Sequence, residues 1–213
     1  MQNWLEYFKE LGFEYIYIKE RKKMDIFKEK LDLLEKIVKN CTLCPLHLKR
    51  KQAVFSDGDP NSPLMFIGEA PGEDEDIQGI PFVGKAGKLL TKMIEKMGLE
   101  RKDVYITNIV KCRPENNRDP LLEEIEKCSP YLIEQIEIIK PKVIVALGRF
   151  SSAFLTGMKT GIKQYRGKWF SYKGIPVMPT FHPSYLLRNA QDRWLVWEDM
   201  KEVLKKLNLK IPK

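Results

Sequence analysis

The chain of 213 residues lacks the features that define several protein classes. It has only four cysteines, too few for a small scaffold held together by disulfides. No apolar run approaches the roughly 18 residues that a membrane-spanning helix needs, so we expect no membrane association. Hydrophobic residues still make up 43% of the chain, which excludes a disordered protein. The N-terminus, with Glu6 and Glu10, lacks the basic and then apolar layout of a signal peptide, and we expect a cytoplasmic protein.

Acidic residues are outnumbered, which suggests an anionic partner. The chain has 37 Lys and Arg against 29 Asp and Glu, a formal net charge of +8. Residues 1–40 hold 9 basic and 8 acidic residues, so the surplus, 28 against 21, lies in residues 41–213. A Lys- and Glu-rich thermophile surface is the alternative explanation.

The hydrophobic periodicity predicts one α/β domain at residues 24–213, preceded by an appendage of unknown role at residues 1–23. Strands and helices alternate along the domain, an order that favours three α/β/α layers around a mostly parallel, four-stranded sheet. We expect this domain to be a monomer. The predicted helices cover about 24–39, 84–97, 121–139, 148–155 and 192–207, the first three strands cover 64–67, 104–107 and 143–147, and a hairpin covers 165–178.

The cysteines form a C-x2-C pair, Cys41 and Cys44, followed by Cys112 and Cys128. Such a pair is typical of a redox centre, a zinc half-site or an iron–sulfur half-site. Because there is no fifth cysteine, one closed site with four thiolates is favoured. The alternative is that Cys112 and Cys128 are ordinary buried cysteines.

Three loops rich in polar groups follow predicted strands. They begin at Gly68, Asn108 and Phe181, and they include a glycine-rich turn, a basic segment and one of the two histidines. In an open parallel sheet, sites form outside the carboxyl ends of the strands, so the three loops are expected to meet at one crevice.

These segments together resemble the family 4 uracil-DNA glycosylases, the iron–sulfur members of their superfamily. The matching motifs are G-E-A-P-G, P-F-V-G-K-A-G, T-N-I-V-K-C-R-P-x-N-N-R and F-H-P-S-Y-L-L-R, and the resemblance covers about residues 41 to 207. It implies the fold of that superfamily and a monofunctional enzyme that flips uracil out of DNA and hydrolyses its N-glycosidic bond. A [4Fe–4S] cluster held by the four cysteines is also implied, with zinc as the alternative.

The resemblance assigns roles to single residues around the flipped base. His182 is expected to donate to uracil O2 as negative charge develops there, and Asn108 to pair with O4 and N3–H, a pattern that cytosine does not offer. Phe82 would stack on the base, and Glu75 would exclude the methyl group of thymine. From the residue types alone, core packing is the better interpretation of Phe82, and Asn108 is also typical of a turn and Glu75 of a solvated loop.

The attacking water has no obvious base. Ala70 stands where family 1 relatives have an aspartate, so Glu69 is expected to orient the water with help from the backbone of Ala70 and Pro71. Positioning could suffice, because the reaction is strongly dissociative.

DNA binding is assigned to the same loops. Ser184 is expected to hold a phosphate, and either Leu186 or Leu187 to enter the space that the base leaves. The expected partner is single- or double-stranded DNA that contains uracil, within the nucleoid, and a replication clamp is a candidate partner. Two other functions stay open, a glycosylase of broader base choice and a silent iron–sulfur DNA-binding module. The candidate phosphate contacts are Lys85, Lys111, Arg113, Arg118 and Arg188.

Overall fold

The computed structural model describes residues 23–158 and 160–212. The predicted appendage at residues 1–23 therefore lies outside the described residues, except for the first residue of a helix. Within the described ranges, no helix is long and apolar enough to cross a membrane.

The sheet has six strands instead of the expected four: the parallel strands that the sequence predicts, the edge strand β5 that forms the predicted hairpin with β6, and a short edge strand β1 that was not predicted. The strand order is β1-β3-β2-β4-β6-β5. β3, β2, β4 and β6 run parallel, whereas β1 and β5 pair antiparallel at the two edges. The strand bounds are β1 Asp57–Gly58, β2 Leu64–Gly68, β3 Tyr105–Asn108, β4 Val143–Leu147, β5 Phe170–Tyr172 and β6 Ile175–Thr180.

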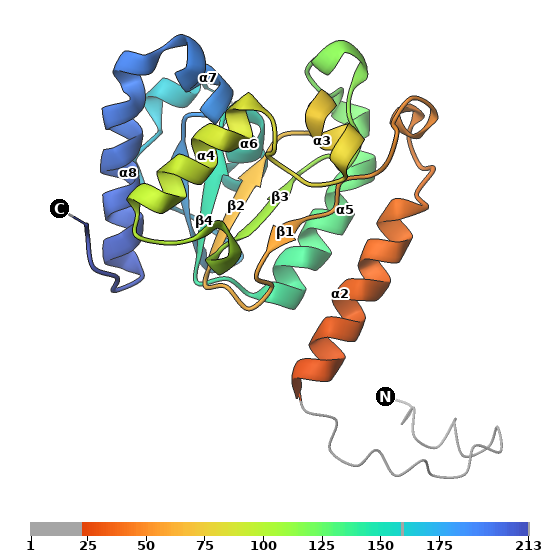
Figure 1. The fold of residues 1–213 in the computed structure, drawn as a ribbon, viewed down its shortest axis with the longest axis horizontal. Coiled ribbons are helices and arrows are strands. Elements are labelled where there is room, and N and C mark those ends of the chain that lie inside the picture. The colour runs from red at the N-terminus through yellow and green to blue at the C-terminus, as the bar shows by residue number, and fades with distance from the viewer. Residues whose placement is uncertain (1–22, 159, 213) are drawn as a thin grey trace.

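Helices cover both faces of this sheet, as Figure 1 shows. Because side chains alternate along β2, Met65 and Ile67 pack in one core, whereas Leu64 and Phe66 pack in the other. The first core joins the sheet to α2 (Lys23–Lys39), α5 (Leu122–Ile139) and α6 (Arg149–Thr156). The second core joins it to α4 (Lys85–Lys96) and α8 (Arg193–Lys206). The predicted three-layer α/β/α architecture is thus confirmed.

Two short helices near the carboxyl ends of the strands were not predicted. α3 (Glu73–Gln78) is formed by the acidic run, whose carboxylates are favoured in the first turn of a helix. α7 (Pro183–Arg188) begins with a proline, which suits the first helical position because it has no N–H to leave unsatisfied. Both helices carry or border expected site residues, so they order segments that the sequence reading treats as loops.

Candidate active site

The three predicted loops meet in one cleft of about 600 Å³ at the carboxyl ends of the parallel strands. Two backbone hydrogen bonds join the first loop to the second, from Ile109 N to Gly68 O at 3.2 Å and from Val110 N to Glu69 O at 2.9 Å. The predicted residues that line the cleft are Glu69, Ala70, Pro71, Glu75, Phe82, Asn108, Arg118, His182, Ser184 and Arg188.

Two of these side chains, Asn108 and Phe82, lie directly against the backbone of Gly68. A Cβ atom on Gly68 would stand 2.3 Å from Asn108 Oδ1 and 2.4 Å from Cζ of the Phe82 ring. Any larger residue at this position would therefore displace both groups. Gly68 also pairs in register with Asn108 across β2 and β3, so the sheet itself places Asn108 beside Gly68.

Asn108 offers an unused acceptor. Its side chain is 2% exposed, and its Oδ1 is buried without a hydrogen-bond partner among the described residues. A buried polar atom without a partner costs about 1–3 kcal/mol, and such atoms are rare in folded proteins. The acceptor therefore matches a ligand that brings its own donor into the cleft.

His182 presents a defined tautomer. The backbone N–H of Ser184 donates to His182 Nδ1 at 3.2 Å, so in the neutral ring the proton is on Nε2. The Ser184 hydroxyl donates to the same Nδ1 over 2.7 Å. Although the side chain borders the cleft, burial of the ring lowers its pKa to about 4. His182 is therefore a neutral N–H donor at physiological pH.

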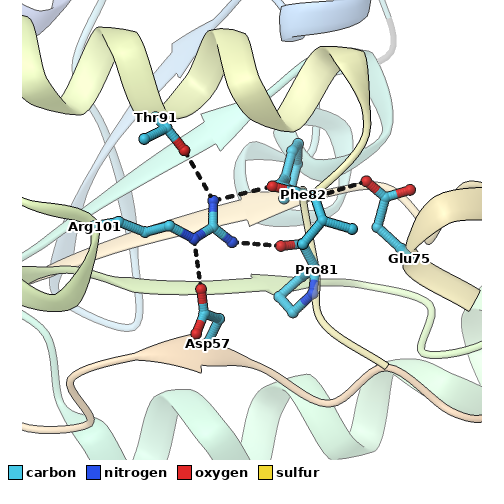
Figure 2. A network of polar contacts seen from close by, with 7 residues as sticks. Asp57, Glu75, Pro81, Phe82, Thr91 and Arg101 are labelled. Carbon is cyan, nitrogen blue, oxygen red and sulfur yellow. Dashed lines mark hydrogen bonds and ion pairs between the residues drawn. The ribbon is translucent and has the colours of Figure 1, made fainter. Parts of the chain in front are cut away.

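Phe82 lies beside His182, with 5.6 Å between the ring centroids. Its φ angle is 53°, in the left-handed region that bulky residues seldom adopt. The strain of such a residue is about 1–3 kcal/mol and has to be stabilised by its surroundings. Figure 2 shows Glu75 and Arg101 on either side of the Phe82 backbone.

Glu75 uses its carboxylate to organise the backbone. Oε2 accepts from Gly72 N at 3.0 Å, and Oε1 accepts from Val83 N and Gly84 N, both at 2.8 Å. The side chain is buried, so the solvated loop is excluded. Glu75 still lines the cleft, where its expected part in excluding thymine stays a prediction.

Glu69 is a carboxyl group that titrates near neutral pH. Burial raises its pKa to about 7, and Asp119 raises it as well, whereas the positive charge of Arg149 opposes the shift. Asp119 and Arg149 form an ion pair with each other, and both line the cleft. Glu69 can therefore hold or release a proton at this site in the physiological range.

Two expected DNA contacts are wrong in this structure. Leu186 is 1% exposed and packs in the core, whereas Leu187 is 43% exposed, so only Leu187 remains as a wedge. Lys111 is also buried, and its Nζ donates to Thr107 Oγ1, Asn108 O and Gln135 Oε1. An ammonium committed in this way is not available to a phosphate.

Other expected contacts already have partners, or lie outside the cleft. The hydroxyl and the backbone N–H of Ser184 both donate to His182 Nδ1, so neither is free to donate to a phosphate in this conformation. Arg118 forms two hydrogen bonds with Glu124, and Arg113 donates to Asn117 Oδ1 at 2.8 Å. Lys85, Arg113 and Leu187 are not among the described residues that line the cleft.

Several residues that line the cleft were not predicted from the sequence. Gly148 and Arg149 directly follow β4, so the rule applied to the other strands would have found them. Asp119 and Tyr185 carry no comparable signal, because their place depends on how the second and third loops fold.

All four cysteines line a second, smaller cavity between α2, the second loop and α5. No three described His, Cys, Asp or Glu side chains converge closely enough to hold a single metal ion. A zinc ion needs its thiolates about 2.3 Å from one point. In a [4Fe–4S] cluster the four cysteines bind different irons, and here the four cysteines line one cavity.

Donors and positive charge surround these sulfurs. Arg50 Nη1 lies 2.8 Å from Cys112 Sγ, and the backbone N–H of Lys111 lies 3.2 Å from Cys128 Sγ. Burial raises the pKa of Cys128 to about 12, so a thiolate there requires a metal partner. Burial also lowers the pKa of Lys111 to about 7, while the nearby Cys128 and Cys112 oppose that shift. The donor set fits an anionic cluster.

The parallel sheet carries a cleft at its carboxyl edge, and this fold and site define the class of protein to which the chain belongs. The chain belongs to the uracil DNA glycosylase superfamily, whose family model matches residues 55–207.

Within that class, the chain is similar to type-4 uracil-DNA glycosylases. The relative from Thermotoga maritima is 49% identical over 82% of this chain and 93% of its own length. The relative from Saccharolobus solfataricus is 49% identical over 85% of this chain and 88% of its own length. That from Sulfurisphaera tokodaii is 50% identical over 81% of this chain and 84% of its own length. The resemblance in the motifs therefore extends to most of the chain.

Proposed function

We propose that this protein is a monofunctional glycosylase that flips uracil out of DNA and hydrolyses its N-glycosidic bond, which starts base excision repair. The observation that carries the proposal is the buried, unpartnered Oδ1 of Asn108 in the same cleft as a neutral His182. Uracil N3–H supplies the donor that Oδ1 lacks, and uracil O4 accepts from the amide Nδ2. Cytosine presents the opposite pattern at these two positions and leaves both groups unpaired.

His182 stabilises the leaving group. As the C–N bond breaks, negative charge develops on uracil O2 and N1, and the Nε2–H of His182 donates to O2. A neutral donor suits this step, because it strengthens its bond to the developing charge without a proton transfer. Phe82 stacks on one face of the base beside this donor.

Glu69 orients the water. Its deprotonated form accepts a hydrogen bond from the attacking water, and the backbone of Ala70 and Pro71 limits where that water can lie. Because the sugar already has oxocarbenium character, placement of the water contributes more than its deprotonation. The described cleft lining contains no lysine to form a Schiff base, and the product is an abasic site in an intact strand.

Cys41, Cys44, Cys112 and Cys128 would hold a [4Fe–4S] cluster. Bound there, the cluster would brace the second loop, and the hydrolysis itself needs no electron transfer. Lys111 connects the cysteines to Asn108 directly. Its backbone N–H donates to Cys128 Sγ, and its side-chain Nζ donates to the backbone carbonyl of Asn108. The cysteines thereby support the residue that reads the base.

DNA contacts complete the proposal. Leu187 is the exposed wedge, and Arg188, which lies at the end of α7 and lines the cleft, is the candidate for a flanking phosphate. The monomeric state, the replication clamp as a partner and the nucleoid location stay predictions.

The test is excision from oligonucleotides that each contain one uracil, thymine, hypoxanthine or xanthine, followed by alkaline cleavage of abasic sites. We expect cleavage of the uracil strand alone, and none before alkali is added. Excision of hypoxanthine or xanthine would support broader base choice. Binding without excision would support a silent DNA-binding module.

A further inference from the structure

The left-handed conformation of Phe82 is imposed by a network that the proposed chemistry does not use. Gly87 of α4 lets the backbone at Phe82 lie directly against the helix, because a Cβ there would stand 1.9 Å from the Phe82 carbonyl. Close packing alone does not choose between the conformations of a loop residue. The choice is made by the groups that bind its two flanking peptides.

The guanidinium of Arg101 binds both carbonyls that flank Phe82. Nη2 donates to Pro81 O at 2.5 Å, and Nη1 donates to Phe82 O at 3.0 Å. These oxygens belong to the two peptide groups on either side of the Phe82 Cα, so the two bonds together restrain its φ and ψ. Nε donates to Asp57 Oδ2 at 2.5 Å, and Nη1 also reaches Thr91 Oγ1 at 3.3 Å (Figure 2).

Glu75 holds the second of these peptide groups from its other end. The peptide between Phe82 and Val83 accepts from Arg101 through its carbonyl and donates to Glu75 Oε1 through its N–H. Rotation of this peptide would break both bonds. Figure 2 shows the cation and the carboxylate on opposite sides of the Phe82 backbone.

We infer that Arg101 is a positioning residue for uracil excision, whose planar fork holds Phe82 in the conformation that places its ring beside Asn108 and His182. The inference rests on the stacking role proposed above for Phe82. Arg101 precedes β3 and Asn108 ends it, so Arg101 acts from the other end of the strand. It is not among the described residues that line the cleft.

Lysine cannot replace this arginine. A guanidinium offers five donors in one plane and serves four acceptors here, whereas an ammonium is a point charge with a different geometry. Arg101→Lys therefore keeps the charge and loses the fork. Lys102→Ala is the matched control, since it removes a cation one residue away that is 73% exposed and pairs with Glu100.

The test measures single-turnover excision and DNA affinity separately. We expect Arg101→Lys to slow excision from the saturated complex by about 5- to 30-fold, the factor by which a released left-handed residue favours other conformations. The dissociation constant for DNA with uracil should stay within about 2-fold. Lys102→Ala should change neither quantity.

A double-mutant cycle distinguishes positioning from general weakening of the fold. In a Phe82→Ala background there is no ring to place, so Arg101→Lys should slow excision by less than about 2-fold further. The same loss in both backgrounds, or a loss confined to DNA affinity, would overturn the inference. Phe82→Ala at the wild-type rate would instead refute the stacking role itself.

A second variant covers the case in which Arg101→Lys is unfolded at the assay temperature, as circular dichroism would show. Asp57→Asn leaves both carbonyl contacts in place and weakens only the anchor at Nε. We expect a smaller loss of rate with the same dependence on Phe82. A loss independent of Phe82 would overturn the inference here too.

Discussion

Replacing His182 by alanine removes one neutral donor and little else from the cleft. With a pKa of about 4, only about one ring in a thousand is protonated at pH 7, so the group lost is an N–H dipole and not a cation. Loss of one such donor at a developing oxyanion costs about 2.7–4 kcal/mol, or roughly 10²–10³-fold in rate. We expect that loss in single-turnover excision, and a far smaller change in affinity for uracil-containing DNA, because phosphate contacts dominate affinity.

Ser184→Ala is the control for this experiment. It removes the hydroxyl that donates to Nδ1 and keeps the backbone N–H that sets the tautomer, so the ring loses part of its orientation. One neutral hydrogen bond contributes about 0.5–1.5 kcal/mol, and we expect a 2- to 10-fold slower reaction. If His182→Ala instead weakens DNA binding while the bound complex reacts at the normal rate, His182 is a phosphate or packing residue.

Three further changes test the rest of the site. Because burial raises the pKa of Glu69 to about 7, single-turnover rates should rise between about pH 6 and pH 8. Glu69→Gln should abolish this rise. The variant should also have a higher free energy of unfolding at pH 8, because the wild-type protein buries a charged carboxylate there. A pH profile with an unchanged step in Glu69→Gln would assign the titration to another group. Asn108→Asp should weaken uracil excision and reduce the discrimination against cytosine, since a carboxylate can accept from cytosine N4; unchanged uracil activity would make Asn108 a turn residue. Anaerobically purified protein should absorb near 400 nm and contain about four irons, and Cys128→Ser should lower both the iron content and the melting temperature; stoichiometric zinc without iron would contradict this.

Periodicity predicted the long elements well because each buries a continuous apolar stripe. The helices at α2, α4, α5, α6 and α8 begin and end within a few residues of the expected bounds. The edge strand β5 was predicted as part of a hairpin, whereas β1 has two residues, too few to show an alternating pattern. α3 was missed because acidic residues at a helix start and a solvated acidic loop have the same composition, and only burial of Glu75 and Asp76 separates them.

The candidate site was predictable where its residues follow strands directly, and not where contacts join distant segments. Asn108 and the first loop follow from the carboxyl-edge rule. Arg101 touches Phe82 across 19 residues and Asp57 across 44, and nothing local in the sequence marks either contact. Burial of Leu186 beside an exposed Leu187 likewise depends on the unpredicted α7. The contacts of Arg101 and the burial of Leu186 both depend on where a side chain points, and the bounds of strands and helices do not determine that.

The cleft separates the groups that hold DNA from those that act on the base. The base-reading groups are neutral or titrate near pH 7: an amide at Asn108, an uncharged imidazole at His182 and a carboxyl at Glu69. Full positive charge on the cleft lining comes from arginines, of which Arg118 and Arg149 are paired with carboxylates. Attraction between Arg188 and phosphate is screened by salt, whereas buried dipoles that are already oriented are screened much less. A cation at His182 would carry the cost of burying its charge, and the same burial keeps the ring neutral. The neutral ring, oriented through Nδ1, confines its contribution to the step in which charge develops.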